Sequence, residues 1–421
     1  MLAGICLMER IVSLFGIVLF LLLAWGLSES RRAFPWRTVL AGLGLQVLLA
    51  LFILRSQTGA ELFGFLDSVF SGLLSYAQAG TRMVFGPMAD AKVLEGGLGQ
   101  GNGFIFAITV TGTIVLVSAL SSLLYHYGIL QLVVRGVAAV MQRVMRLSGS
   151  ESLASAANIF MGQTEAPLVI KPYLLTMTRS ELMSVMVGGM ATIAGGVLAA
   201  YVAMGISAGH LLTASVMSAP AALLMAKILL PEREESATAA GASAEIKRET
   251  TNGLEAVCNG ASDGIKLSIN IMAMLIAFVA LVALANGMLA HGLSWVGVQQ
   301  AQPLQWVLGY VNAPFAWLMG VPAEECLKVG AILGERVVLN EFIGYLSLSQ
   351  AAGSLDPRTV MITTFALCGF ANFSSIAIQI GGIGALVPER KADLARLGLK
   401  SMLGGLLACY TTACIAGLVA G

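Results

Sequence analysis

The sequence predicts an all-α polytopic membrane protein, and three observations support this fold class. The 421 residues are 57% hydrophobic and only 11% charged, whereas soluble domains carry about twice that charged fraction. The apolar runs are far too long, and too free of alternation, for the strands of a membrane β-barrel. Polar residues, glycine and proline interrupt some of these runs, which predicts broken helices beside the simple spans.

Charge and metal-ligating residues narrow the function classes further. The net charge of +1 gives no indication of a nucleic-acid partner. The six cysteines are scattered without a CxxC pair, and the three histidines lie far apart. Small apolar core residues explain these cysteines better than a disulfide framework or a metal cluster does.

Eight stretches are expected to be transmembrane helices. They are residues 11–26, 38–54, 104–124, 182–206, 210–230, 267–288, 358–386 and 395–418. A signal peptide is the alternative for the first, but no clear cleavage site follows it. Lys and Arg gather in the loops after the first, third, fifth and seventh spans, so these loops are expected in the cytoplasm. Both termini then lie outside the cytoplasm, in a protein of the inner (plasma) membrane whose spans contact the lipid bilayer.

Other segments are too polar to cross the membrane. Residues 60–85 and 129–147 are expected to form amphipathic interfacial helices, and the aromatic segment 303–320 suits the headgroup level. Residues 88–103 are expected to be a glycine-rich loop, and 254–270 an interfacial approach to the next span. One further hydrophilic stretch, 231–252, is expected to be a flexible cytoplasmic linker.

The first interruption lies within residues 151–180. Gly162 and Pro167 bracket polar residues there, which predicts two half-helices that form a re-entrant hairpin. Pro167 suits the first turn of the second half-helix, where its missing N–H costs nothing. The span that follows is expected to break near Gly188-Gly189 and Gly195-Gly196.

Residues 323–380 repeat the pattern of residues 151–200. Each begins with a polar hairpin that holds a carboxylate, Glu165 or Glu341, and continues with a broken span. The predicted topology starts one hairpin inside and the other outside, so the hairpins have opposite orientations and the repeat is inverted. Such paired interruptions indicate a transporter's midplane site. The expected regions are 1–147 (mostly scaffold), 148–230 (first transport repeat), 231–253 (linker), 254–320 (scaffold) and 321–421 (second transport repeat).

Glu165 and Glu341 are the acids expected to function, because an intramembrane carboxylate is costly unless it is paired, hydrated or protonated. The alternative is a structural Glu that a helix N-terminus or a buried partner satisfies. The remaining acids of the second hairpin are expected to be structural and close to the aqueous end, with Lys328 and Arg336 nearby: Glu324, Glu325 and Glu335.

The polar residues beside the breaks suit a neutral solute rich in hydroxyl and amide groups, because they include no permanent cation. They are Gln163, Thr164, Glu165, Glu341, Asn372 and Ser375. Phe370 offers a face for a flat ring, although ordinary packing explains it nearly as well. Oxygens of Asn158 and Thr192 near loosened carbonyls are typical of a Na⁺ site. The alternatives are that Asn158 caps a half-helix and that Thr192 bonds its own preceding turn.

Three motifs resemble those of the concentrative nucleoside transporter family. They are Gly-Gln163-Thr164-Glu165-Ala-Pro, Leu-Asn340-Glu341-Phe and Gly-Phe370-Ala-Asn372-Phe-Ser-Ser375, and the likeness spans roughly residues 150–390. The resemblance implies a homotrimer whose protomers have eight spans, two opposed re-entrant hairpins and interfacial helices. It also implies an elevator motion of a transport part against a scaffold.

The resemblance implies a role for each matching residue. The nucleobase would be faced by Gln163, Thr164 and, mainly through water, Glu165, and lined by Phe370 and Val197. Ribose hydroxyls would be bound by Glu341, Asn372 and Ser375. Na⁺ would be held by Asn158, Thr192 and the carbonyls of Met161 and Ile193. The expected function is import of nucleosides such as uridine by symport with Na⁺, with H⁺ as the alternative coupling ion.

Two other function classes have less support. A membrane-embedded enzyme would need catalytic groups, but the sequence offers no Ser/His pair, HExxH motif or metal-spaced cluster, so no enzymatic activity is expected. A channel would favour a continuous polar stripe along several spans, whereas the polar residues here gather at two breaks. The sequence does not predict a preference between pyrimidine and purine nucleosides.

Overall fold

The computed structural model describes residues 2–99, 105–242, 250–295 and 297–419, and these ranges contain helices and no strand. The N-terminal helices are α1 (Leu2–Gly26), α2 (Trp36–Arg55), α3 (Gln57–Phe85), α4 (Ala91–Leu98), α5 (Phe106–His126) and α6 (Ile129–Met145). The middle helices are α7 (Gly149–Asn158), α8 (Ala166–Val169), α9 (Arg179–Ala191), α10 (Gly195–Ala203) and α11 (Ala208–Leu229). The C-terminal helices are α12 (Gly253–Ser294), α13 (Pro303–Leu318), α14 (Cys326–Val338), α15 (Glu341–Ala351), α16 (Pro357–Leu367), α17 (Phe373–Leu386) and α18 (Lys391–Val419). The predicted all-α class is confirmed.

Seven helical segments of the described ranges are long and apolar enough to cross a membrane. They correspond to seven of the eight expected spans. The remaining one, 358–386, is divided into α16 and α17 by the non-helical residues 368–372. The structure therefore contains a broken helix where the sequence predicts one.

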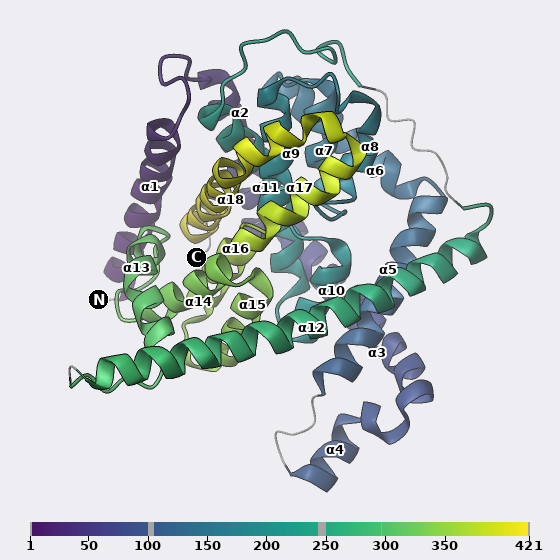
Figure 1. The fold of residues 1–421 in the computed structure, drawn as a ribbon, viewed down its shortest axis with the longest axis vertical. Coiled ribbons are helices and arrows are strands. Elements are labelled where there is room, and N and C mark those ends of the chain that lie inside the picture. The colour runs from purple at the N-terminus through teal and green to yellow at the C-terminus, as the bar shows by residue number, and fades with distance from the viewer. Residues whose placement is uncertain (1, 100–104, 243–249, 296, 420–421) are drawn as a thin grey trace.

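The membrane helices differ in how far other parts of the protein cover them. In α11 and α18, 89% of the apolar stretch is buried, whereas in α12 only 11% is buried. Figure 1 shows α12 crossing the molecule as one long helix beside α5, while α9, α11 and α18 lie together inside the bundle. The first broken span, which includes α9, therefore lies inside the bundle, and α12 presents most of its apolar surface outward.

Several local expectations are wrong. Residues 88–103 are not all loop, because Asp90 caps α4 by accepting the Lys92 N–H at 3.0 Å; residues 100–104 lie outside the described ranges. The expected approach over residues 254–270, in contrast, does run into the next span, and both belong to the 42-residue α12. The pair Gly188-Gly189 stays helical within α9, and the break falls at residues 192–194.

The expected amphipathic helix over 129–147 is present as α6, which buries Val134, Ala138 and Met141 on one side. The other two expected interfacial segments form α3 and α13. Their placement at the membrane surface stays a prediction, because it depends on the position of the bilayer.

A buried ionic cluster anchors the base of the first hairpin. The Lys227 ammonium on α11 lies 2.8 Å from Glu151 on α7, and both side chains are at most 4% exposed. Glu151 also accepts the Ser148 N–H at 2.9 Å, which completes a capping box at the start of α7. The ion pair therefore holds the start of the first hairpin against α11, inside the bundle.

The stretch expected to be a free linker takes part in this anchor. Thr238 is buried, and its hydroxyl lies 2.8 Å from the Ser150 hydroxyl at the start of α7. Ser236 donates to Glu181 at 2.5 Å, near the start of α9. Residues 231–242 therefore pack over the hairpin base, which corrects the prediction for this part of the linker; residues 243–249 lie outside the described ranges.

Lys227→Met is expected to lower the free energy of unfolding by about 3–5 kcal/mol, because it leaves the buried Glu151 without its cation. Lys266→Met is the matched control: Lys266 lies 3.1 Å from Asp263, but both side chains are at least 70% exposed. An exposed pair is worth about 0–1 kcal/mol. Thermal unfolding of the purified protein in detergent measures both, and equal shifts would contradict the anchoring role.

Candidate functional site

Two hairpins and two broken helices provide the candidate site. In the first half, α7 and α8 form the hairpin, and the break at 192–194 separates α9 from α10. In the second half, α14 and α15 form the hairpin, and the break at 368–372 separates α16 from α17. Figure 1 shows α7 and α8 toward one end of the bundle and α14 and α15 toward the other. The order of elements is thus the same in both halves, as the predicted repeat requires.

The first hairpin reaches the second broken helix through Gln163. Its side-chain Nε2 donates to the Ser375 hydroxyl at 3.2 Å, and both residues are buried. Its Oε1 has no hydrogen-bond partner in the described part of the chain. A Cβ on Gly189 of α9 would lie only 2.8 Å from the Gln163 Cβ, so glycine is what allows this close approach.

The second hairpin reaches both broken helices through Glu341. Asn340 caps α15 by accepting the Ile343 N–H at 3.0 Å, and this cap places Glu341 in the first helical turn. One carboxylate oxygen accepts the Asn372 amide N–H at 2.9 Å, and the other accepts the Tyr201 hydroxyl at 3.2 Å. Glu341 is 6% exposed, so these two bonds satisfy most of a buried carboxylate.

These contacts join into one hydrogen-bonded path. Asn372 caps α17 by accepting the Ser375 N–H at 2.9 Å, and Ser375 in turn accepts from the first hairpin. The path passes through Gln163, Ser375, Asn372, Glu341 and Tyr201. All four interrupted elements therefore contribute to a single polar cluster in the interior of the protein.

Four predicted residues lie beside this path rather than on it. Glu165 accepts the N–H of Gly162 at 3.2 Å and is exposed, as is Thr164. Val197 is buried at the start of α10, and Phe370 is half-buried within the second break. Among the described contacts, Glu165 is not bonded to the Glu341 cluster.

Asn158 is the most unusual of the predicted ion ligands. It is 1% exposed, and neither side-chain atom has a hydrogen-bond partner in the described part of the chain. Its amide approaches Gly188, where an added Cβ would lie 3.1 Å from Nδ2, and the Thr192 hydroxyl donates to the Gly188 carbonyl at 2.9 Å. Thr192 therefore bonds its own preceding turn, which was the alternative to an ion ligand. Asn158 does not form the helix cap that was its alternative role. A buried, unpaired amide oxygen is a hard ligand that suits a small cation.

The predicted backbone ligands lie on the same two segments as Asn158 and Thr192. Met161 follows α7 and is half-buried, and Ile193 lies within the first break and is 1% exposed. The Gly195 N–H donates to the Phe160 carbonyl at 3.2 Å, which ties the loop after α7 to the start of α10. The four predicted ion ligands are therefore on segments that touch.

Arg336 and Tyr201 occupy positions that the sequence does not predict. Arg336 does not lie at an aqueous end: it is completely buried and donates to the Gly369 carbonyl at 3.3 Å. Glu335 instead binds Ser347 at 2.6 Å and Gln305 at 3.2 Å. Tyr201 stands in an apolar helix without a polar neighbour in sequence, so only the tertiary contact with Glu341 reveals it.

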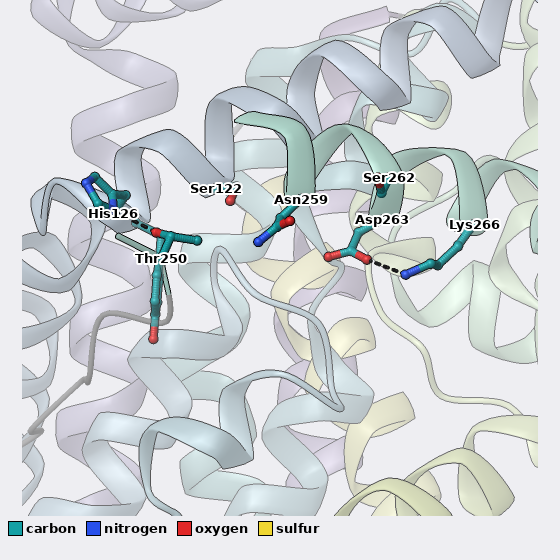
Figure 2. A pocket seen from close by; sticks show the side chains of 8 residues that line it. Ser122, His126, Thr250, Asn259, Ser262, Asp263 and Lys266 are labelled. Carbon is teal, nitrogen blue, oxygen red and sulfur yellow. Dashed lines mark hydrogen bonds and ion pairs between the residues drawn. The ribbon is translucent and has the colours of Figure 1, made fainter. Parts of the chain in front are cut away.

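A separate polar cavity of about 280 Å³ lies between α5 and α12. Figure 2 shows His126 and Thr250 on one side, 2.6 Å apart, and Asp263 with Lys266 on the other. No residue of the predicted site lines this cavity, so it does not enter the candidate site.

Gly369→Ala is expected to lower the free energy of unfolding by about 1–3 kcal/mol, because it overpacks the contact between the two breaks. The new Cβ would lie 2.6 Å from the Met190 carbonyl oxygen and 2.8 Å from the Ala191 carbonyl carbon. Gly381→Ala on α17 is the control, since nothing lies within 4 Å of its added Cβ. Thermal unfolding in detergent compares them, and an unchanged melting temperature for Gly369→Ala would contradict the close contact.

Comparisons with known proteins agree with one another. Three family models match: "Na+ dependent nucleoside transporter N-terminus" over 15–88, "Nucleoside recognition" over 107–208 and "Na+ dependent nucleoside transporter C-terminus" over 210–417. An uncharacterized transporter of Haemophilus influenzae is 43% identical, with 98% of this chain and 99% of that protein covered. The nucleoside permease NupC of Helicobacter pylori is 40% identical, with 98% of each covered. A solved structure of CNTnw in an inward-facing substrate-bound state matches with a TM-score of 0.91 at 39% identity, covering 98% of each chain.

Proposed function

Since the chain belongs to the concentrative nucleoside transporter family and is a membrane transporter of nucleosides, not an enzyme, we propose that it imports them by symport with Na⁺. The observation that carries this proposal is the hydrogen-bonded path from Gln163 to Tyr201, which joins both hairpins and both broken helices. A site shared by all four interrupted elements can be closed from either side, as alternating access requires.

The second half of the chain is proposed to bind the ribose. A ribose hydroxyl can donate to the Glu341 carboxylate and accept from the Asn372 amide, and Ser375 offers a further hydroxyl. In the structure these groups bond to one another, which keeps them satisfied without substrate. A ribose hydroxyl can therefore take the place of one partner in these hydrogen bonds, and the new hydrogen bond is of similar strength.

The first half is proposed to bind the nucleobase. Gln163 carries an unpaired amide oxygen that can accept an N–H from a base edge. Thr164 and Glu165 are exposed, which suits contact with the base through water, and Val197 and Phe370 line the ring. Uridine, a small neutral nucleoside, is the first substrate to test.

Na⁺ is the proposed coupling ion, because Asn158 has an unpaired amide oxygen and its amide group lies against Gly188, at the start of the Gly188–Thr192 turn. The carbonyls of Met161 and Ile193 would complete the ligand set. The description "Na+ dependent" in two matching family models supports this choice.

The proposed transport cycle is an elevator motion. The transport part comprises residues 148–230 and 321–421, and the scaffold comprises 1–147 and 254–320, joined by the linker at 231–253. The outward apolar surface of α12 suits contact with lipid and with two further protomers of a homotrimer. The protein is proposed to lie in the inner membrane with both termini outside the cytoplasm.

Uridine uptake into proteoliposomes is expected to rise with an inward Na⁺ gradient and not with a pH gradient alone. Asn158→Ala is expected to raise the Na⁺ concentration for half-maximal uptake by about tenfold, equivalent to about 1.4 kcal/mol. Asn312→Ala is the matched control, because Asn312 is also buried but bonds the Leu308 carbonyl on α13. Uptake that ignores Na⁺ and follows the pH gradient would establish the proton alternative.

Glu341→Gln is expected to weaken uridine binding by about 10- to 100-fold, because a hydrogen bond to a charged group contributes about 1.5–3 kcal/mol. Glu335→Gln is its control: Glu335 is also 6% exposed and hydrogen-bonded but lies outside the path. Equilibrium binding to the purified protein measures both, with adenosine and inosine included to define the base preference. Full binding by Glu341→Gln would rule out the assigned role.

A further inference from the structure

Arg336 is a fully buried cation within the second hairpin. Its side chain is 0% exposed on α14, and its Nη2 donates to the Gly369 carbonyl at 3.3 Å and to the Cys409 sulfur at 3.2 Å. The other two guanidinium nitrogens, Nε and Nη1, have no hydrogen-bond partner in the described part of the chain. A buried charge with neutral partners is costly, so a balancing charge nearby is expected.

Glu341 is the acid in a position to balance this charge. It begins the other arm of the same hairpin, three residues after α14 ends, and it is itself 6% exposed. The two arms meet closely: a Cβ on Gly344, three residues after Glu341, would lie 3.4 Å from the Arg336 Cβ.

The two charged residues hold the second break from different arms of the hairpin. Arg336 binds the carbonyl of Gly369, and Glu341 binds the side chain of Asn372. Phe370 lies between these points, and the Asn372 N–H donates to its carbonyl at 2.9 Å. Moving Arg336 would therefore move the segment that carries the proposed ribose and base contacts.

We propose that Arg336 is a positioning residue of the nucleoside site, which fixes the Gly369–Asn372 segment and balances the charge of Glu341 so that both face the ribose. This inference rests on the proposed function for its ligand. It does not require Arg336 to touch the substrate. Lysine at this position would keep the charge but lose the fork of donors, so the two contributions can be separated.

Binding of uridine and of 3′-deoxyuridine to the purified full-length protein tests the positioning role. Arg336→Met is expected to weaken uridine binding by tenfold or more and to bring the ratio of the two dissociation constants toward one, because the ribose contacts are displaced. Arg336→Lys is expected to give a ratio between those of wild type and Arg336→Met, because it keeps the charge. An unchanged ratio in Arg336→Met would overturn the proposal.

Arg358→Met is the matched control. Arg358 is another arginine of low exposure that binds two backbone carbonyls, those of Gly320 and Gly417, and an acid, Glu9. Arg358→Met is expected to lower thermal stability without changing the ratio of the two dissociation constants. A fall in the ratio for this variant equal to that for Arg336→Met would show a general effect of lost packing and would also overturn the proposal.

A stability cycle without ligand provides a second readout. The melting temperature of wild type, Arg336→Met, Glu341→Gln and the double variant is measured in detergent. Arg336→Met is expected to cost less in the Glu341→Gln background, because the double variant buries no lone charge. Additive shifts would overturn the charge-balancing role. If wild type binds no nucleoside, the proposed function fails, while this cycle still decides the Arg336–Glu341 coupling.

Discussion

A helix that breaks inside a membrane protein must find partners for the polar groups that the break releases, and this structure is arranged around that requirement. At the second break, Asn372 caps α17 and Arg336 binds the Gly369 carbonyl. At the first break, the Thr192 hydroxyl returns to the Gly188 carbonyl, and the Gly195 N–H donates to Phe160. Each break is thus stabilised by side chains or by the neighbouring hairpin.

The same requirement explains why the site lies where it does. Some partners of the broken helices are side chains, such as Thr192 and Arg336, and a side chain can exchange its bond for one to a ligand. Backbone groups inside an intact helix are already bonded to one another. Gln163 and Asn158 retain unpaired polar atoms although both are buried. Unpaired atoms of this kind are costly in a folded protein unless a ligand, ion or water completes them. They therefore mark the places where substrate and ion are proposed to bind.

Packing of small residues brings these elements close enough to act together. Gly189 allows Gln163 to lie against α9, and Gly369 allows the second break to lie against the first. The first broken span, residues 179–203, is 83% buried, whereas only 11% of the apolar stretch of α12 is buried. The buried polar groups beside the breaks are thus separated from the exposed apolar surface of α12.

The amino-acid sequence is enough to predict the class of protein, seven of the spans, the division of 358–386 and the residues beside each break. These follow from composition and local order, since apolar length, glycine, proline and clustered polar residues act within a few turns of helix. Local composition did not predict α4 or the packing of residues 231–242, where capping and long-range contacts override it. The three motifs of 163–165, 340–341 and 370–375 could be recognised in the chain, but their hydrogen bonds to one another could not. The hydrogen bond from Tyr201 to Glu341 and the burial of Arg336 beside Gly369 are visible only in the folded protein, because residues distant in sequence become neighbours when the two halves fold together.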